Sequence, residues 1–293
     1  MDQNEFNSLI KLLDDPDQSI YEHVRSRILE LGEPVIPELE AAWEQNVFGV
    51  EFQHRIEQLI RDIQIKSIIR SLETWTANGA QNLLEGALLV NRFQYPDFDE
   101  EATLKTLELI QQDVWIELNP NLTAFEQVKI INHILFDVHG FSGNRRNFHA
   151  PKNSFLSEVV SSRKGNPLSL GLIYSIIAQN LEIPIYGVNL PNHFVLAYLD
   201  RFSLFKTNSI EKAAALFYIN PFSRGAVFSK AEIDHFLKQL KVDPKPEFYR
   251  PSGNKAIILR LLRNLEYSYS KVGDQDKIHE IGLLISVLEQ HPA

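Results

Sequence analysis

The segment from Leu168 to Ala178 constrains the fold more than any other part of the chain. It reads Leu-Ser-Leu-Gly-Leu-Ile-Tyr-Ser-Ile-Ile-Ala, so apolar residues recur on nearly every side of the helix that it would form. A helix of that kind outside a membrane lies at the centre of a domain, because all of its faces need cover. Pro167 precedes it and suits the first helical position, where an N–H would have no partner. The sequence therefore predicts a buried central helix that begins near residue 167.

Short strands are predicted after this helix, and other helices before it. Runs rich in β-branched and aromatic residues predict strands at 185–188, 194–198, 203–205, 217–219 and 226–228. Short strands in quick succession favour an antiparallel sheet packed on the central helix. From residue 2 to about 138, apolar residues spaced three and four apart predict helices. The expected fold class is α+β, mostly helical, with one small antiparallel sheet.

The N-terminal region 1–78 has the pattern of a helical pair. One apolar stripe is followed, after an Asp-Asp-Pro-Asp turn, by a second stripe that Gly32 and Pro34 close. The two stripes are formed by Leu9, Leu12 and Leu13 and by Tyr21, Val24, Ile28 and Leu31. The pair resembles a HEAT repeat. Since one repeat cannot bury its own apolar face, we expect a helical appendage docked on the next domain rather than a free solenoid.

Composition excludes several classes of function. The chain has no cysteine, which removes disulfides, cysteine-ligated zinc, iron–sulfur clusters and thiolate nucleophiles. A net charge of -9 does not match the basic surface of duplex-binding proteins, so we expect no nucleic-acid partner. The histidines form no HExxH pattern and no phosphate-binding glycine loop is present, so neither a metal nor a cofactor is expected. The N-terminus resembles no secretory leader, and no apolar run reaches the roughly 18 residues that a membrane helix needs. These features predict a cytoplasmic protein without a membrane partner.

Five ordered segments carry a resemblance to a known family. They are Gly140-Phe141-Ser142-Gly143-Asn144, Asn153-Ser154-Phe155-Leu156, Gly165-Asn166-Pro167-Leu168-Ser169-Leu170, Pro191-Asn192-His193-Phe194 and Asn220-Pro221-Phe222. In this order they resemble the SirB-type transglutaminase-like family. The last helical pair, with Gly273-Asp274, resembles the tetratricopeptide-like tail of such proteins. The resemblance implies a HEAT-like region at 1–78, a transglutaminase-like core with its leading helices at 79–242, and a tetratricopeptide-like tail at 243–293.

The family resemblance also implies a papain-like site, in which a helix N-terminus carries the nucleophile and a sheet supplies a histidine and then Asp or Asn. A thiol at that position is partly ionised by the helix dipole and the imidazolium, while the third residue fixes the histidine tautomer. His193 matches the histidine, and Asn220 stands where Asp is usual. Counted back from Ile183-Pro184, the cysteine position falls on Pro167. Proline has no nucleophile, so the resemblance implies a degenerate site.

Three functions remain open at this stage. The first is a non-catalytic protein that acts in protein binding or regulation. It would reuse the transglutaminase-like cleft for a protein or peptide, and the helical repeats at both ends would offer partner surfaces. The second is a hydrolase or acyl-transferase that uses Ser169 with His193 and Asn220, although two residues turn Ser169 about 200° away from Pro167. The third is a structural module of an assembly. Arg145-Arg146 beside His149, with Arg163-Lys164 nearby, form a small basic cluster. It is interpreted as a solvated loop or as a contact for an anion or acidic peptide near the cleft. Substrate, partner and oligomeric state stay undetermined.

Overall fold

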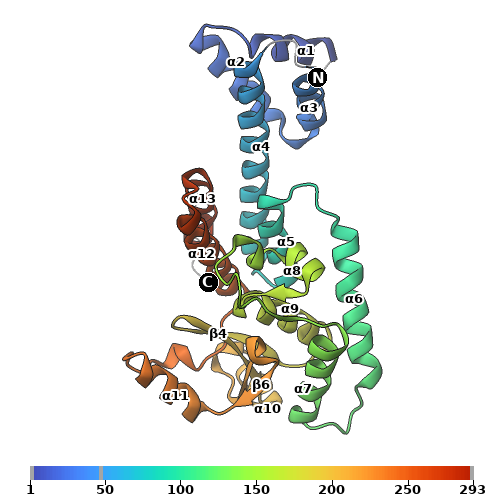
Figure 1. Cartoon of the computed structure of the whole chain (residues 1–293), viewed down its shortest axis with the longest axis vertical. Coiled ribbons are helices and arrows are strands. Elements are labelled where there is room, and N and C mark those ends of the chain that lie inside the picture. Colours follow the sequence, from blue (N-terminus) through green and yellow to red (C-terminus); the bar gives the residue numbers. More distant parts are fainter. Residues whose placement is uncertain (1–2, 46–48, 291–293) are drawn as a thin grey trace. The chain divides into compact units, whose positions relative to one another are not determined.

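A computed structural model describes residues 3–45 and 49–290 (Figure 1). Contacts between residues divide the chain into two compact units, and the division falls between Thr74 and Trp75. This is a division by contacts alone, and the predicted ranges 1–78, 79–242 and 243–293 stay predictions. None of the described helices is both long enough and apolar enough to span a membrane.

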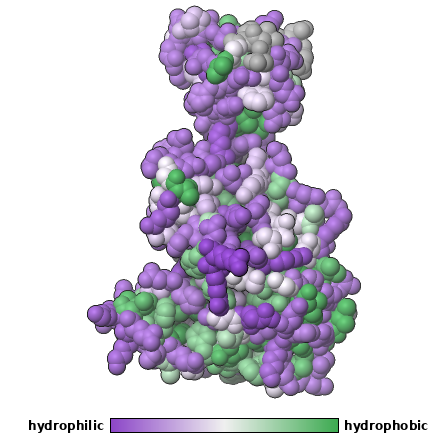
Figure 2. All heavy atoms as spheres, in the orientation of Figure 1, coloured by the Kyte–Doolittle hydropathy of each residue, from purple (hydrophilic) through white to green (hydrophobic). Residues whose placement is uncertain are grey.

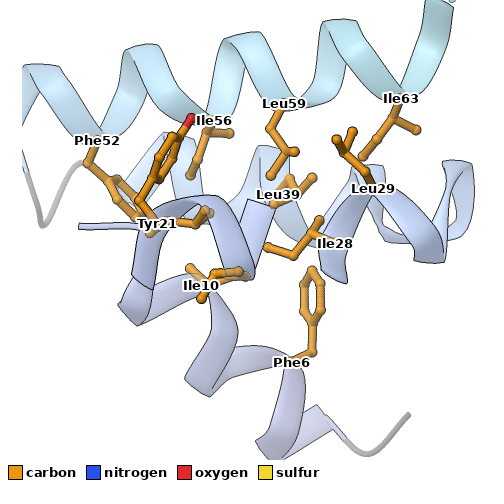
Figure 3. Close-up of a cluster of buried hydrophobic side chains, with 12 residues drawn as sticks. Phe6, Ile10, Tyr21, Ile28, Leu29, Leu39, Phe52, Ile56, Leu59 and Ile63 are labelled. Atoms are coloured by element: carbon orange, nitrogen blue, oxygen red, sulfur yellow. The ribbon is translucent and has the colours of Figure 1, made fainter. Parts of the chain in front are cut away.

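The first unit is a group of helices around one apolar core. Its elements are α1 (Gln3–Leu12), α2 (Gln18–Leu31), the 3₁₀ turn η1 (Glu33–Val35), α3 (Ile36–Gln45) and α4 (Val50–Ala77) as far as Thr74. The Asp17 carboxylate caps α2 by accepting a hydrogen bond from the Ser19 amide at 2.8 Å. This bond satisfies an N–H that has no partner within the helix. Figure 3 shows one side of α4, with Phe52, Ile56 and Leu59, directed at the side chains of the three shorter helices. The apolar stripes predicted for this region contribute to this core, except for Leu12, which is 40% exposed.

Helices lead the second unit, as the apolar spacing predicts. They are α5 (Leu83–Gln94), α6 (Glu100–Glu117), α7 (Ala124–Asn132) and α8 (Leu156–Ser162). At the start of α7, Thr123 and Glu126 each accept a hydrogen bond from the other's backbone amide, at 3.3 and 2.8 Å. This reciprocal pair is the capping box that the Thr-x-x-Glu spacing indicates. A π-helical segment, η2 (His133–Val138), continues α7 almost to the expected end near His139.

The central helix and the sheet confirm the α+β class. Helix α9 (Pro167–Asn180) is buried from Leu168 to Ala178 on all sides, as its composition predicts. It packs on β3 (Ile185–Leu190) and β4 (His193–Leu199). The antiparallel sheet continues with β5 (Ala215–Asn220) and β6 (Ala226–Phe228), in the order β3-β4-β5-β6. A separate parallel pair joins β1 (Ser142–Gly143) to β2 (Lys164–Gly165).

The strand predicted at 203–205 is wrong, because these residues belong to helix α10 (Arg201–Thr207). The Asp200 carboxylate accepts a hydrogen bond from the Ser203 amide at 2.8 Å. A bond of this kind caps and starts a helix, and here it outweighs the strand preference of the aromatic residues. Phe202 and Phe205 are then left 73% and 86% exposed. Hydrophobic residues gather among hydrophilic ones on the lower part of the face seen in Figure 2.

Helices also end the second unit. The remaining elements are the 3₁₀ turns η3 (Pro151–Ser154), η4 (Ile210–Lys212), η5 (Pro221–Ser223) and η6 (Pro246–Phe248), and the helices α11 (Lys230–Gln239), α12 (Asn254–Val272) and α13 (Gln275–Gln290). Ser229 and Glu232 form the predicted capping box of α11. Helix α12 packs against both α13 and α5, so the C-terminal pair is part of the second unit. The part of α12 from Arg260 to Ser268 also lines the cavity at the head of the central helix, where the candidate site lies.

Candidate functional site

A cavity of about 440 Å³ lies at the head of α9, within the second unit. Pro167 and His193 line this same cavity. The assignment of Pro167 to the nucleophile position of the family stays a prediction. The other lining residues come from the loop before η3, the head of α9, the turn between β3 and β4, the start of β4 and one side of α12. They are Phe148, His149, Asn166, Leu168, Asn192, Phe194, Arg260, Asn264, Tyr267 and Ser268.

A tight turn places His193 at the first position of β4. Leu190 pairs with His193 across the hairpin, and Pro191 and Asn192 form the turn between them. Asn192 has a φ of 56°. This is the left-handed region, which asparagine tolerates better than most residues, while proline presets its own φ. The sequence Pro-Asn-His thus fixes both the end of β3 and the place of the imidazole.

The environment of His193 favours a neutral imidazole. Burial lowers the pKa of His193, and the positive charge of Arg260 lowers this pKa further. The Arg260 Nη2 also donates a hydrogen bond of 2.7 Å to the His193 carbonyl oxygen. The imidazole lies 5.9 Å, between ring centroids, from the ring of Phe236 in α11. A neutral imidazole can accept a hydrogen bond from a ligand, and it can take the proton of a neighbouring thiol to form an ion pair with the thiolate.

Phe194 joins the strand of His193 to the central helix. The ring is 1% exposed and lies between two glycines, Gly171 of α9 and Gly187 of β3. A Cβ at Gly171 would come within 2.6 Å of the ring, and one at Gly187 within 2.4 Å. Only residues without a side chain fit on either side of this ring. The two glycines therefore set how closely β4 approaches α9, and with it the place of His193 near the helix head.

Ser169 belongs to the helix cap and does not line the cavity. The Asn166 side chain accepts a hydrogen bond from the Ser169 amide at 2.9 Å. The Ser169 Oγ in turn accepts one from the Asn166 amide at 3.0 Å and donates one to the Asn166 carbonyl at 3.3 Å. The residue is 2% exposed. Both hydrogen-bonding roles of this hydroxyl are thus used inside the first turn of α9.

Asn220 has a structural partner of its own. It ends β5, and its Oδ1 accepts hydrogen bonds from the amides of Phe222 and Ser223, at 3.1 and 3.2 Å. These bonds cap the short turn η5. Among the described residues, no hydrogen bond joins the Asn220 side chain to His193. The structure thus brings His193 and Pro167 to one cavity but leaves Ser169 and Asn220 with capping roles.

The other signature segments hold the cavity wall in place. Asn144 donates a hydrogen bond of 2.9 Å to the Asn153 side chain. Asn153 donates in turn to the carbonyls of Asn147 and Phe148, at 2.6 and 3.1 Å. Asn153 is buried, so these bonds satisfy amide hydrogens that would be costly to bury alone. The network orders the loop that carries Phe148 and its neighbour His149 at the cavity.

Helix α12 supplies lining residues that the sequence analysis missed. Arg260, Asn264 and Tyr267 are spaced four and three apart, so they share one side of the helix. The signal was present as a polar line between the buried leucines and isoleucines of α12, but the tail was interpreted only as a partner surface. The basic cluster Arg145-Arg146 does not line the cavity. Within residues 3–45 and 49–290, no group of three His, Cys, Asp or Glu side chains is arranged to hold a metal ion.

A known family covers the part of the chain that holds the central helix and the sheet. The model of the transglutaminase-like superfamily matches residues 101–263, which is more than half of the chain. The chain belongs to the transglutaminase-like superfamily. The match includes the central helix, the sheet, His193 and Arg260, and it ends before the other lining residues of α12.

Relatives of this transglutaminase-like chain include SirB-type proteins, which confirms the predicted family. A UPF0162 protein of Xylella fastidiosa is 28% identical over 206 residues, which cover 67% of each chain. Protein SirB1 of Salmonella typhimurium is 25% identical over 204 residues, or 68% of this chain and 71% of SirB1. F-box only protein 21 of Mus musculus is 28% identical over 143 residues, 46% of this chain but only 20% of the mouse protein. No solved structure matches the chain.

Proposed function

We propose that this transglutaminase-like protein is non-catalytic and that its cleft binds a protein or peptide. The observation that carries the proposal is that Pro167 and His193 line one cavity in a chain without cysteine. A proline at the head of α9 leaves the imidazole without a sulfur to activate. The cavity is within the range of about 300–1,000 Å³ that ligand sites have, and three aromatic residues line it. Loss of the nucleophile in a cleft that remains open favours binding over turnover.

The alternative is a hydrolase or acyl-transferase that uses Ser169, His193 and Asn220. Serine needs a general base within hydrogen-bond reach, because a helix dipole alone does not ionise a hydroxyl. The bonds of Ser169 to Asn166 and its position outside the cavity lining weigh against this alternative. The cap role of Asn220 weighs against it as well.

The two flanking regions extend the proposal. We assign partner contacts to the HEAT-like region 1–78 and the tetratricopeptide-like tail 243–293, and place the protein in the cytoplasm. The match to about one fifth of F-box only protein 21 supports use of this core as a module within longer proteins. A purely structural role in an assembly is the competing idea, and it predicts that the cavity can be filled without loss of binding.

Turnover measurements test the catalytic half of the proposal. The wild-type chain would be incubated with p-nitrophenyl acetate and with a peptide p-nitroanilide, as ester and amide probes. We expect rates no higher than those of Ser169→Ala and His193→Ala. Ser175→Ala is a matched control, because Ser175 is a second buried serine of α9 that is distant from the cap. A rate lost in the first two variants and kept in the control would establish the serine enzyme instead.

Peptide selection tests the binding half. Peptides would be selected from a displayed random library on the immobilised wild-type chain, and their dissociation constants measured on two variants. Asn264→Trp fills the cavity from α12, while Ser270→Trp adds the same ring to an exposed position of that helix. We expect Asn264→Trp to weaken binding by at least about tenfold, as for a blocked central pocket, and Ser270→Trp to leave it unchanged. Selected peptides that bind both variants equally would refute a binding role for the cleft.

A further inference from the structure

Arg260 is the least expected residue of the cavity. Its guanidinium has five N–H donors. Two of these are used, by the Asn189 Oδ1 at 3.2 Å and by the His193 carbonyl at 2.7 Å. Burial lowers the pKa of Arg260 to about 10, and no neighbouring charge contributes to that shift. Over the described parts of the chain, no carboxylate forms an ion pair with Arg260. A partly buried arginine of this kind has both the charge and the free donors to hold an anion.

The charges around Arg260 agree with this role. The protein carries a net charge of -9, yet none of the described residues that line the cavity is acidic. Two histidines and Arg260 line it instead, together with the amides of Asn192 and Asn264. A recess with a positive charge and no carboxylate attracts anions, even though the protein as a whole is acidic. The recess is separate from the Arg145-Arg146 cluster, which does not line it.

The size and walls of the cavity indicate the class of anion. Arg260 is the one residue in the lining with a permanent charge. This matches the single charge of a carboxylate, whereas a phosphate group carries about -1.5 to -2. The rings of Phe148 and Tyr267, which are 40% and 49% exposed, offer an apolar surface for a side chain next to the anionic group. We propose that the cavity holds the carboxylate of a bound peptide, with the Arg260 guanidinium as its ion-pair partner. This inference rests on the proposed peptide-binding function and adds the chemistry that the peptide must have.

Titration with short peptides tests the carboxylate. The probes are N-acetyl-Ala-Phe with a free C-terminus, its C-terminal amide, N-acetyl-Ala-Glu amide with a side-chain carboxylate, and inorganic phosphate, all at one ionic strength. The readout is the ¹⁵N–¹H shift of the Arg260 Nε–H group in the full chain, together with the dissociation constant. We expect at least one carboxylate peptide to bind about tenfold more tightly than the amide of N-acetyl-Ala-Phe, the scale of a charge-assisted hydrogen bond. The two carboxylate probes tell a C-terminus from an acidic side chain.

Two substitutions that add the same negative charge distinguish an effect on anion binding from an effect on folding. Asn264→Asp places a negative charge in the cavity at nearly constant volume, and Ser270→Asp adds the same charge on an exposed part of α12. The first variant should lose the preference for carboxylates, and the second should keep it. Arg260→Lys retains the positive charge but loses the paired N–H donors of the guanidinium, so it should bind the carboxylate peptides more weakly than wild type.

Three outcomes would overturn the inference: equal affinity for the carboxylate and amide peptides, a preference that survives Asn264→Asp, or tighter binding of phosphate than of any peptide. If the carboxylate and amide peptides bind equally well and Asn264→Trp abolishes binding of both, the proposed cleft function stands and only the carboxylate inference is refuted. Failure of the library selection would instead refute the cleft function itself. The two proposals can therefore fail separately.

Discussion

Replacing Gly171 by alanine tests how closely the central helix meets the strand of His193. A mid-helix Gly→Ala change ordinarily stabilises a helix by about 1 kcal/mol. At this position the new Cβ would come within 2.6 Å of the Phe194 ring, which Gly187 confines from the other side. Overpacking costs about 1–3 kcal/mol, and we expect the upper end of that range because the ring is 1% exposed and is approached as closely at Gly187. The net expectation is a loss of about 2 kcal/mol, opposite in sign to helix propensity.

Gly282 provides the matched control. It also lies within a helix, α13 of the same unit, and a Cβ there meets no atom within 4 Å. Gly282→Ala should therefore raise the free energy of unfolding by about 1 kcal/mol. Urea unfolding of the two variants and the wild type, followed by circular dichroism, gives both differences. A Gly171→Ala variant as stable as Gly282→Ala would refute the packing argument, and Phe194→Leu should reduce the cost of Gly171→Ala if the ring causes it.

Three further predictions concern the same region. Ile176→Asp should unfold the second unit, because Ile176 is buried and an unpaired buried charge costs several kcal/mol; a soluble variant with native circular dichroism would contradict this. Asn166→Ala should lower the free energy of unfolding by about 1 kcal/mol through loss of the cap. Asn166→Asp can still accept from the Ser169 amide, so it should lose less in the same urea titration. Burial lowers the pKa of His193 in the folded state, so below pH about 6.5 the unfolded chain binds the proton more readily. Stability should therefore fall as pH drops from 7.5 to 5.5, and the wild type should lose more free energy of unfolding over that range than His193→Gln. Equal losses in the two proteins would show that this imidazole is not desolvated.

The sequence predicts the central helix and most of the sheet because strong local signals and tertiary packing agree there. Residues 168–178 have no polar face, and Asn166 and Pro167 mark the helix start in the way that caps usually do. The strand at 203–205 failed for the opposite reason. A short run of aromatic residues indicates a strand only weakly, and one carboxylate at Asp200 is enough to start a helix instead.

The cavity could be predicted only in part. The order of the signature segments identifies His193 and Pro167, because matching these segments to the family assigns site positions to residues of this chain. Several signature asparagines instead serve the loop and the caps, which the segment order does not reveal. Arg260 lies 67 residues after His193 along the chain. Nothing local links it to the imidazole, because only the packing of α12 brings the two together.

The assignment of Pro167 to the nucleophile position is tested most directly by placing a cysteine there. Since the chain has no cysteine, the variant Pro167→Cys carries a single thiol, and its alkylation by iodoacetamide can be followed without background. The rate would be measured against pH in this variant and in Pro167→Cys combined with His193→Ala. We expect the helix head and His193 to lower the thiol pKa below its usual value of about 8.5, and the second substitution to reverse part of that shift. A thiol pKa that does not respond to His193 would contradict the placement of Pro167 at the lost nucleophile.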